Sequence, residues 1–383
     1  MSWGEEWAPE APAPLVDLDG LLRHVAEGGG SDLHLTVGAP PTVRVRGEMT
    51  PVPGTAVLTA EDLREALYAV MTERQRQVLE ETRELDFAYA VPGLARFRVN
   101  VFWQREAVGA VMRLIPWRIT PLEDLGMPPV VETFGHLKRG LVLVTGPTGS
   151  GKSTTLAAML DQINRTRRGH IMTIEDPIEF LHQHQGCLVN QREVGADTRD
   201  FRSALKHVLR QDPDVILVGE LRDLETISVA LTAAETGHLV LATLHTQSAQ
   251  DTVSRVVDVF PSGQQQQVRT QLAATLQAVV CQTLVPTADG TSRAVAAEIM
   301  VCTPGVRAMI RDDKTYQIPN LMQLGYRVGM RTADNALMDL VESDLITPEL
   351  AWTRALSPGE FEALCTPKFV ADARAAINEE DGS

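Results

Sequence analysis

The stretch GPTGSGKST, residues 146–154, decides how the rest of the chain is interpreted. It lies between two apolar segments, residues 141–145 and 156–160, an order typical of a strand, a glycine-rich loop and a helix. Glycines allow successive backbone N–H groups to turn into one concavity, and a helix that begins there adds its positive end. The stretch therefore predicts a loop that binds the phosphates of a nucleoside triphosphate. The pattern G-x-x-x-x-G-K-[ST] is filled by Gly146, Gly151, Lys152 and Ser153.

Two side chains of this loop carry specific expectations. We expect Lys152 to reach the β- and γ-phosphates of ATP and the hydroxyl of Ser153 to hold Mg²⁺. The alternative, a flexible Gly/Ser turn, does not account for the strand and helix patterns on either side. The predicted nucleotide-binding residues are Gly146, Pro147, Thr148, Gly149, Ser150, Gly151, Lys152, Ser153 and Thr154.

Composition limits the class of protein. The chain has 383 residues, which favours more than one domain, and its net charge of −15 argues against a surface built mainly for nucleic acid. Its four cysteines are widely spaced, so neither a zinc site nor a disulfide framework is indicated. The acidic, proline-rich N-terminus has no signal-peptide pattern, and no apolar run approaches the ~18 residues of a membrane span. We expect a cytoplasmic protein that reaches the membrane surface only through a partner.

The patterns along the chain predict an α/β fold with a smaller α+β domain in front. The apolar runs after residue 140 alternate with helical stretches, as in a parallel sheet covered by helices. Prolines crowd the interval before that point, which we interpret as a linker. The predicted parts are a disordered extension (1–14), the α+β domain (15–115), the linker (116–140), the α/β domain with a helical end (141–356) and a C-terminal tail (357–383).

Three local predictions concern single elements. One long helix is expected over residues 59–81, capped by Thr59 with Asp62 at the capping-box position. A second helix is expected over residues 264–281. A hairpin is expected from residues 283–286 and 294–300.

Polar groups follow the predicted parallel strands at the point where each strand ends. Glu175 ends the run 171–175, Glu220 follows the run 215–219, and His245 follows the run 239–244. In an open α/β sheet, ligands bind beyond the carboxyl ends of the strands. These three side chains and the glycine-rich loop therefore predict one site.

A triphosphate site needs a carboxylate for Mg²⁺ and a group that orients the attacking water. Glu220 is expected to fill either role and Glu175 to share it, and the sequence does not decide which of them accepts the proton. The structural alternative is that one of them pairs with Arg222 or caps a helix. His245 is preferred over His238 as the sensor of the γ-phosphate, because His238 belongs at the opposite end of the strand.

The segment RFRVNVFWQR places arginines on one face of a strand and apolar residues on the other. Arg96 and Arg98 share the polar face, and Arg105 and Arg113 are nearby alternatives. The structural interpretation is a solvated strand face. The functional one is that these arginines reach a nucleotide bound by a neighbouring subunit, as arginine fingers do.

Together these stretches resemble the type II/type IV secretion ATPase superfamily and, within it, the PilT-like retraction ATPases of twitching motility. Residues 305–311, GVRAMIR, are similar to a motif of the retraction branch, and the chain lacks the four-cysteine zinc element of extension ATPases. The N-terminal extension and the segment after residue 356 depart from the family pattern. The other matching stretches are GSDLHL (30–35), PPTVRVRGE (40–48), ARFRVNVFWQR (95–105), TIEDPIEF (173–180), RQDPDVILVGELRD (210–223), TAAETGHLVLATLHT (232–246), KTYQIPN (314–320) and GMRTADNALMDL (329–340).

The resemblance implies a RecA-like P-loop ATPase domain preceded by a PAS-like domain. It implies a homohexameric ring with ATP at the subunit boundaries, completed by Arg96, Arg98 or Arg113 of a neighbouring subunit. It further implies docking on the cytoplasmic side of an inner-membrane platform protein (PilC-like) and ATP-driven withdrawal of pilin subunits into the membrane.

Other functions share parts of this pattern. An assembly ATPase of a type IV pilus or of type II secretion would use the same site. A nucleotide-gated adaptor that hydrolyses little ATP is disfavoured by two acids and a histidine at the strand ends. A nucleic-acid motor is disfavoured by the acidic balance and by the absence of a basic stretch interleaved with aromatic residues.

Overall fold

The structure, a computed structural model, describes residues 16–45, 47–115 and 118–372. The chain forms two compact units, Met1–Trp117 and Arg118–Ser383. The whole of the disordered extension predicted for residues 1–14, and the acidic end of the predicted tail, lie outside the described residues. Within the described residues, no helix is both long and apolar enough to cross a membrane.

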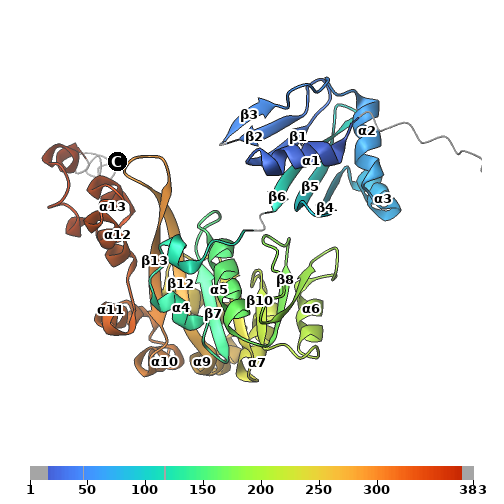
Figure 1. The fold of residues 1–383 in the computed structure, drawn as a ribbon. Helices are drawn as coiled ribbons and strands as arrows, with labels where there is room; N and C mark the ends of the chain where they lie inside the picture. The colour runs from blue at the N-terminus through green and yellow to red at the C-terminus, as the bar shows by residue number, and fades with distance from the viewer. Residues whose placement is uncertain (1–15, 46, 116–117, 373–383) are drawn as a thin grey trace, which may run out of the picture. The chain divides into compact units, whose positions relative to one another are not determined.

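The first unit is an antiparallel sheet with helices on one face (Figure 1). The sheet order is β3-β2-β1-β6-β5-β4. Its strands are β1 (Gly30–Leu35), β2 (Thr42–Val45), β3 (Glu48–Pro51), β4 (Glu84–Val91), β5 (Ala95–Gln104) and β6 (Ala107–Ile115). Its helices are α1 (Leu18–Glu27), α2 (Ala60–Ala69) and α3 (Glu73–Thr82).

The two faces of β5 differ as the alternating sequence predicts. Phe97, Val99 and Val101 are buried in the core that α1, α2 and α3 cover. Arg98, between them, is exposed on the opposite face. The apolar face therefore fixes the register of the sheet, because a slip by one residue would expose it and bury the arginines.

The single helix predicted for residues 59–81 is wrong, because the chain breaks it into α2 and α3. Thr72 begins α3 with a complete capping box: its hydroxyl accepts from the N–H of Gln75, and its own N–H donates to Gln75 Oε1 at 2.8 Å. A threonine with Gln three residues later is a helix-start signal that helical periodicity masks. The predicted cap at Thr59 is confirmed, since Thr59 accepts from the N–H of Asp62.

The second unit is built on a mostly parallel sheet of order β13-β12-β7-β11-β10-β8-β9. All neighbouring strands run parallel except β12 and β13. The α/β fold class predicted for this part is confirmed. The strands are β7 (Gly140–Thr145), β8 (His170–Glu175), β9 (Leu188–Glu193), β10 (Val215–Val218), β11 (Leu239–Leu244), β12 (Leu276–Pro286) and β13 (Arg293–Val301).

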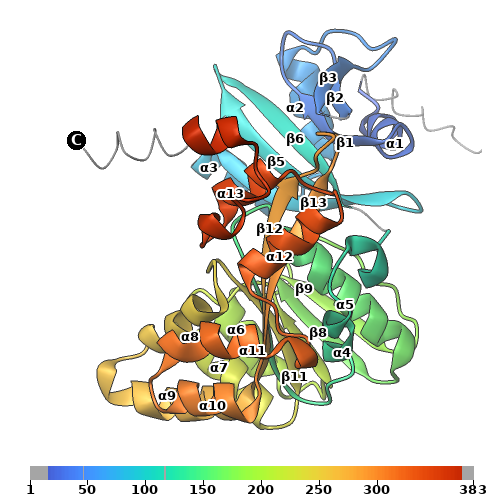
Figure 2. The same ribbon diagram turned by 90° about the vertical axis from the view of Figure 1, so that its left-hand side faces the viewer.

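Helices cover both faces of this sheet, as Figure 2 shows. Buried side chains of α4 and α5 pack on one face, and those of α6 to α10 pack on the other. The C-terminal helices α12 and α13 pack on the extended end of the β12–β13 hairpin. The helices are α4 (Val130–Phe134), α5 (Lys152–Thr166), α6 (Phe201–Val208), α7 (Leu224–Glu235), α8 (Ala249–Asp258), α9 (Ser262–Thr275), α10 (Pro304–Arg311), α11 (Ile318–Leu324), α12 (Ala333–Glu342) and α13 (Pro348–Arg354).

The helix predicted for residues 264–281 is wrong in its last third, residues 276–281. Helix α9 ends at Thr275, and the next residue begins β12, which pairs in parallel with β7. The apolar residues of this stretch suit a helix and a buried strand equally well, so periodicity alone does not separate them. The predicted hairpin is confirmed, since Thr283 pairs with Ala296 across β12 and β13.

The segments at both ends of the second unit contribute to its core. Leu122, in a short 3₁₀ turn, and Val131 and Phe134 of α4 are buried against the sheet, within the interval 116–140 that the sequence analysis assigns to a linker. Phe361, at the start of the interval assigned to a tail, is fully buried beside α12 and α13.

One buried carboxylate holds two helix N-termini. Glu298 of β13 accepts from the N–H of Ala249 at 2.7 Å and from the N–H of Ala333 at 3.2 Å, the first residues of α8 and α12. These N–H groups have no partner within their own helices. Glu298 therefore joins the helix that follows His245 to the C-terminal helices.

The capping box of α3 gives a first prediction. Thr72→Ala should lower the free energy of unfolding of the first unit by about 1 kcal/mol, because it leaves helix N–H groups without an acceptor. Gln75→Ala should have a smaller effect, since it removes only the reciprocal hydrogen bond. Chemical denaturation of the purified chain measures both, and Gln77→Ala on the exposed side of the same helix is the matched control. Equal stability of Thr72→Ala and wild type would show that the cap is not needed for the break between α2 and α3.

Candidate active site

The glycine-rich loop has a conformation that side chains would oppose. Gly146 and Gly151 have φ of 135° and 88°, in the region that favours glycine, and Gly151 is the N-cap of α5. The ammonium of Lys152 donates to the carbonyls of Gly146 at 2.9 Å and Pro147 at 3.0 Å. Burial lowers the pKa of Lys152, and the nearby carboxylates of Glu220 and Glu179 oppose this shift.

The predicted convergence of strand ends is present in the structure. In the register of the sheet, Leu244 of β11 pairs with Thr145 of β7, and Val218 of β10 pairs with Ile174 of β8. Gly219 lies so close to β8 that a Cβ atom there would be 3.3 Å from the Cα of Glu175. The lack of a side chain at this position allows the two acid-bearing strands to end side by side.

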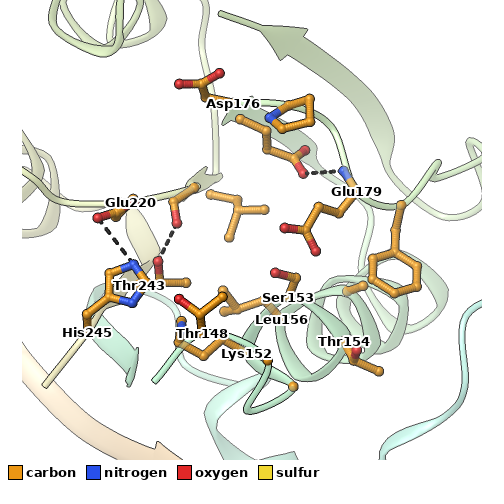
Figure 3. A pocket seen from close by; sticks show the side chains of 18 of the residues that line it. Thr148, Lys152, Ser153, Thr154, Leu156, Asp176, Glu179, Glu220, Thr243 and His245 are labelled. Carbon is orange, nitrogen blue, oxygen red and sulfur yellow. Dashed lines mark hydrogen bonds and ion pairs between the residues drawn. The ribbon is translucent and has the colours of Figure 1, made fainter. Parts of the chain in front are cut away.

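A cavity of about 540 Å³ opens at this edge of the sheet. Its volume is within the usual range for small-molecule sites. Figure 3 shows Lys152 and Ser153 on one side of it and Glu220 with His245 on another. Gly146, Pro147 and Ser150 of the loop do not line the cavity. The predicted residues that line it are Thr148, Gly149, Gly151, Lys152, Ser153, Thr154, Glu175, Glu220 and His245.

The carboxylate of Glu175 is buried, and both of its oxygens accept hydrogen bonds. Its Oε1 accepts from Thr173 Oγ1 at 2.6 Å and from Gln191 Nε2 at 3.2 Å, and its Oε2 accepts from the N–H of Glu179 at 3.4 Å. Burial raises the pKa of Glu175, and these hydrogen bonds offset only part of the effect. A carboxylate with a raised pKa is suited to accept a proton.

Glu220 lies between two basic side chains. Arg222 Nε is 2.7 Å from its Oε2, and His245 Nε2 is 3.3 Å from its Oε1. The pairing with Arg222 is the structural alternative that the sequence raised, yet the side chain of Glu220 still lines the cavity. His245 is thereby linked to an acid of the site, whereas His238 hydrogen-bonds to the carbonyl of Ala233 at the other end of β11.

Three further residues of the site were missed from the sequence. Glu179 lines the cavity, and Figure 3 shows its side chain directed into it. Gln191 of β9 holds Glu175 and also the carbonyl of Phe180, so it fixes the loop after β8. Thr243 donates to the carbonyl of Gly219 and joins β11 to β10 beside Glu220. For Glu179, the available signal was a second glutamate four residues after the first in TIEDPIEF.

The predicted arginines belong to the first unit. Arg98 Nε is 3.6 Å from Asp86 Oδ1, and Arg113 Nε is 2.7 Å from Asp32 Oδ1. Arg96 lies two residues before Arg98 on β5. Their action on a nucleotide stays a prediction.

The comparisons with known proteins identify the family of this chain. The sequence model of the family described as "Type II/IV secretion system protein" matches residues 64–333. A relative from Pseudomonas aeruginosa, "Type IV pilus retractation ATPase PilT", is 51% identical over 346 residues, which cover 90% of this chain and 100% of the relative. "Type IV pilus ATPase PilU" of the same organism is 44% identical over 349 residues, 91% of each chain. The chain belongs to the type II/IV secretion system protein family.

Solved structures give the same result. The crystal structure of the "Pilus Retraction Motor PilT and Bound ADP" matches with a TM-score of 0.84 and 46% identity, over 90% of this chain and 98% of that one. The ATPase DotB of Legionella pneumophila matches with a TM-score of 0.78 and 27% identity, over 90% and 97%. The similarity to PilT-like proteins that the motifs predict is confirmed.

The raised pKa of Glu175 gives a prediction about stability. The folded state binds this proton more tightly than the unfolded state, so the stabilising contribution is present at low pH and is lost as the pH rises through the folded pKa. Glu175→Gln removes this titration and keeps an acceptor for Thr173 and Gln191. We therefore expect Glu175→Gln to be more stable than wild type at about pH 8, with the difference decreasing toward about pH 5.

Thermal melting of the purified proteins at several pH values measures this difference. Glu342→Gln, an exposed position on α12 of the same unit with no contact to Glu175, is the matched control and should melt like wild type at each pH. A pH-independent difference between Glu175→Gln and wild type would show that the carboxyl group is not held in a proton-favouring environment.

Proposed function

We propose that this protein is a motor ATPase that hydrolyses ATP to drive type IV pilus retraction. The observation that carries the proposal is that Lys152, the carboxylates of Glu175 and Glu220, and His245 line one cavity. It occurs in a chain that is similar to PilT over the full length of that relative. A nucleotide adaptor without hydrolysis would need a carboxylate for Mg²⁺ but would not need a second, buried carboxylate such as Glu175 to act on water.

The loop and the start of α5 would bind the phosphate chain. Backbone N–H groups of residues 148–154 and the positive end of the helix favour an anion there. Lys152, now held by two carbonyl oxygens, would neutralise charge on the phosphates. Its buried ammonium is less costly to hold beside an anion than beside carbonyl groups alone.

The donor set of the cavity fits Mg²⁺. Ser153 offers a hydroxyl, and Glu220 offers a carboxylate that lines the same space. Oxygen atoms of this kind are the ligands that Mg²⁺ prefers, usually one or two from the protein with the remainder from phosphates and water. The bound ion would supply neutralisation of charge on the phosphate oxygens.

The two carboxylates would divide the work on the attacking water. Glu175, with its pKa raised by burial, is the better proton acceptor. Glu220, held by Arg222 and His245, would orient the water, and His245 would respond to the γ-phosphate through that contact.

The assembled form is part of the proposal. We infer a homohexamer in which Arg96, Arg98 or Arg113 acts on the nucleotide of a neighbouring subunit. We also infer a cytoplasmic location at the inner face of the membrane, on a platform protein of the PilC kind. The basis is the similarity to PilT and the three arginines on the first unit.

The lysine of the loop gives the most direct test. Lys152→Ala should lower ATP turnover at least about 100-fold, because the charge on the phosphates in the transition state loses a fixed cation. Phosphate release by the purified chain with Mg²⁺ and ATP measures it. Lys206→Ala, an exposed lysine of α6, should keep wild-type turnover. Unchanged turnover in Lys152→Ala would refute the assignment of this site.

A substitution of Glu220 tests ATP binding and ATP hydrolysis separately. Glu220→Gln should retain ATP binding while turnover falls about 100-fold or more, since the amide keeps the shape but loses the charge that orients water. Equilibrium binding of a fluorescent ATP analogue and phosphate release measure the two effects. Wild-type turnover in this variant would remove Glu220 from the mechanism.

An experiment in living cells distinguishes a retraction ATPase from an assembly ATPase. In the bacterium that encodes the chain, Lys152→Ala should leave pili extended and abolish their withdrawal, as seen by imaging of labelled pili. Loss of pili from the surface would instead identify an assembly ATPase.

A further inference from the structure

The face of the first unit that points away from its helices carries a row of charged residues. Reading across the sheet by register, Arg44 of β2 pairs with Asp32 of β1, Asp32 pairs with Arg113 of β6, and Arg113 pairs with Arg98 of β5. Three arginines and one aspartate thus occupy consecutive strands at one level of the sheet. Since this protein has a net charge of −15, such a concentration of positive charge is not a property of its average surface.

The pairing of Arg98 with Arg113 is unfavourable for folding. Residues directly opposite in an antiparallel pair have Cβ atoms about 5 Å apart, and like charges at that spacing are destabilising. A local violation of this kind is expected where a site for a ligand requires it. An anion between the two guanidinium groups would relieve the repulsion.

Asp32 and Arg113 are very unequally exposed. The side chain of Asp32 is 5% exposed and that of Arg113 is 69% exposed, although Arg113 Nε lies 2.7 Å from Asp32 Oδ1. The second oxygen, Oδ2, accepts from Ser31 Oγ at 2.7 Å. Burial disfavours the charged form of Asp32, but Ser31 and Arg113 outweigh it and lower its pKa.

The ion pair between Asp32 and Arg113 contributes little to stability but is well suited to orient the guanidinium of Arg113. An ion pair with a solvent-exposed arginine contributes little to folding, whereas burying the carboxylate has a definite cost. The hydrogen bond to Asp32 uses Nε of Arg113, and the Arg113 side chain as a whole stays exposed, so its guanidinium remains accessible to a ligand. Arg98 is held in a similar way, with its Nε 3.6 Å from Asp86 Oδ1, but both partners there are about half exposed.

We propose that Asp32 is a positioning residue that fixes the guanidinium of Arg113 so that Arg113 and Arg98 together bind an oxyanion. The proposal rests on the proposed function in one respect: the oxyanion is the phosphate chain of ATP. Guanidinium groups suit this ligand because their paired N–H donors match two phosphate oxygens. Of the two arginines paired in this row, Arg113 has the shorter contact with its carboxylate, and Arg98 assists it.

The test uses the full-length protein and compares kcat and KM for ATP hydrolysis. Arg113→Gln should lower kcat at least about 100-fold. Asp32→Ala should lower kcat about tenfold with KM nearly unchanged, as expected when the support of a working residue is lost. Asp32→Asn keeps an acceptor oxygen for Arg113 and should recover part of the loss. Adding Asp32→Ala to Arg113→Gln should cause no further decrease, because Asp32 acts through Arg113.

A matched control is available in the same unit. Glu80 also pairs with an arginine, Arg64, at 3.0 Å, but away from the charged row. Glu80→Ala should leave kcat unchanged. Thermal melting of every variant, with assays run well below the melting temperature, separates lost orientation from lost folding.

Three results would overturn the proposal. The first is an Asp32→Ala protein with a lowered melting temperature and wild-type kcat, which would make the ion pair structural. The second is a double variant, Asp32→Ala with Arg113→Gln, in which the decreases in kcat of the two single variants are equal and add together. The third is loss of the oligomer in Arg113→Gln, measured by light scattering, with normal kcat in the residual oligomer; the arginine would then bind an acid of a neighbouring copy.

Failure of the proposed function has a different signature. It would appear as wild-type protein that binds ATP without releasing phosphate, or as an active Lys152→Ala variant. In that case, binding of the fluorescent ATP analogue still tests the role proposed for Asp32. We expect Arg113→Gln and Asp32→Ala to weaken it by similar factors, about threefold to tenfold, and unchanged binding in both variants would contradict the role of Asp32.

Discussion

The common register of four buried parallel strands is the constraint on which the site depends. Strands β7, β11, β10 and β8 run in one direction, pair without register shifts and end within two residues of one another, so the segments that follow them share one edge of the sheet. Each strand is buried on both faces, and helices on each side hold it in place. The loop that cradles phosphate, the two acids and the histidine are therefore brought together by backbone pairing, before any contact among their side chains.

Much of this arrangement could be predicted from the sequence, because it depends on patterns that are local. Lys152, Glu175, Glu220 and His245 each follow a short apolar run, and parallel pairing converts that position in the sequence into a position in space. The departures from prediction have the same physical origin. Residues 276–281 are apolar enough for a helix, and only the place beside β7 makes them a strand.

The missed residues show what local patterns omit. Gln191 lies on β9, a strand that sequence reasoning did not assign, and its contact with Glu175 is formed only when β9 pairs with β8. The burial of Asp32 likewise follows from strands on both sides of it. The contacts of such supporting side chains depend on which strands pair in the folded protein, so these contacts cannot be assigned until the strand order is known.

The two carboxylates of the site differ because their surroundings differ. Glu175 is shielded from water and receives hydrogen bonds from neutral donors, which leaves its charged form disfavoured. Glu220 is partly open and lies against a guanidinium and an imidazole. Two side chains of identical chemistry thus differ in their surroundings through burial and neighbouring charge, which is the basis on which we propose different roles for them.

The carboxylate of Glu298 connects the C-terminal helices to the nucleotide domain, because it accepts hydrogen bonds from both α8 and α12. One of its oxygens fixes the start of α8, four residues after His245, and the other fixes the start of α12. A displacement of α12 would pull on the same rigid group that anchors the histidine's segment. In a shortened chain that ends before α12, the buried carboxylate of Glu298 would lose one of its two hydrogen-bond donors. Removal of the C-terminal helices would therefore disturb the segment after His245, although these helices are distant in the sequence.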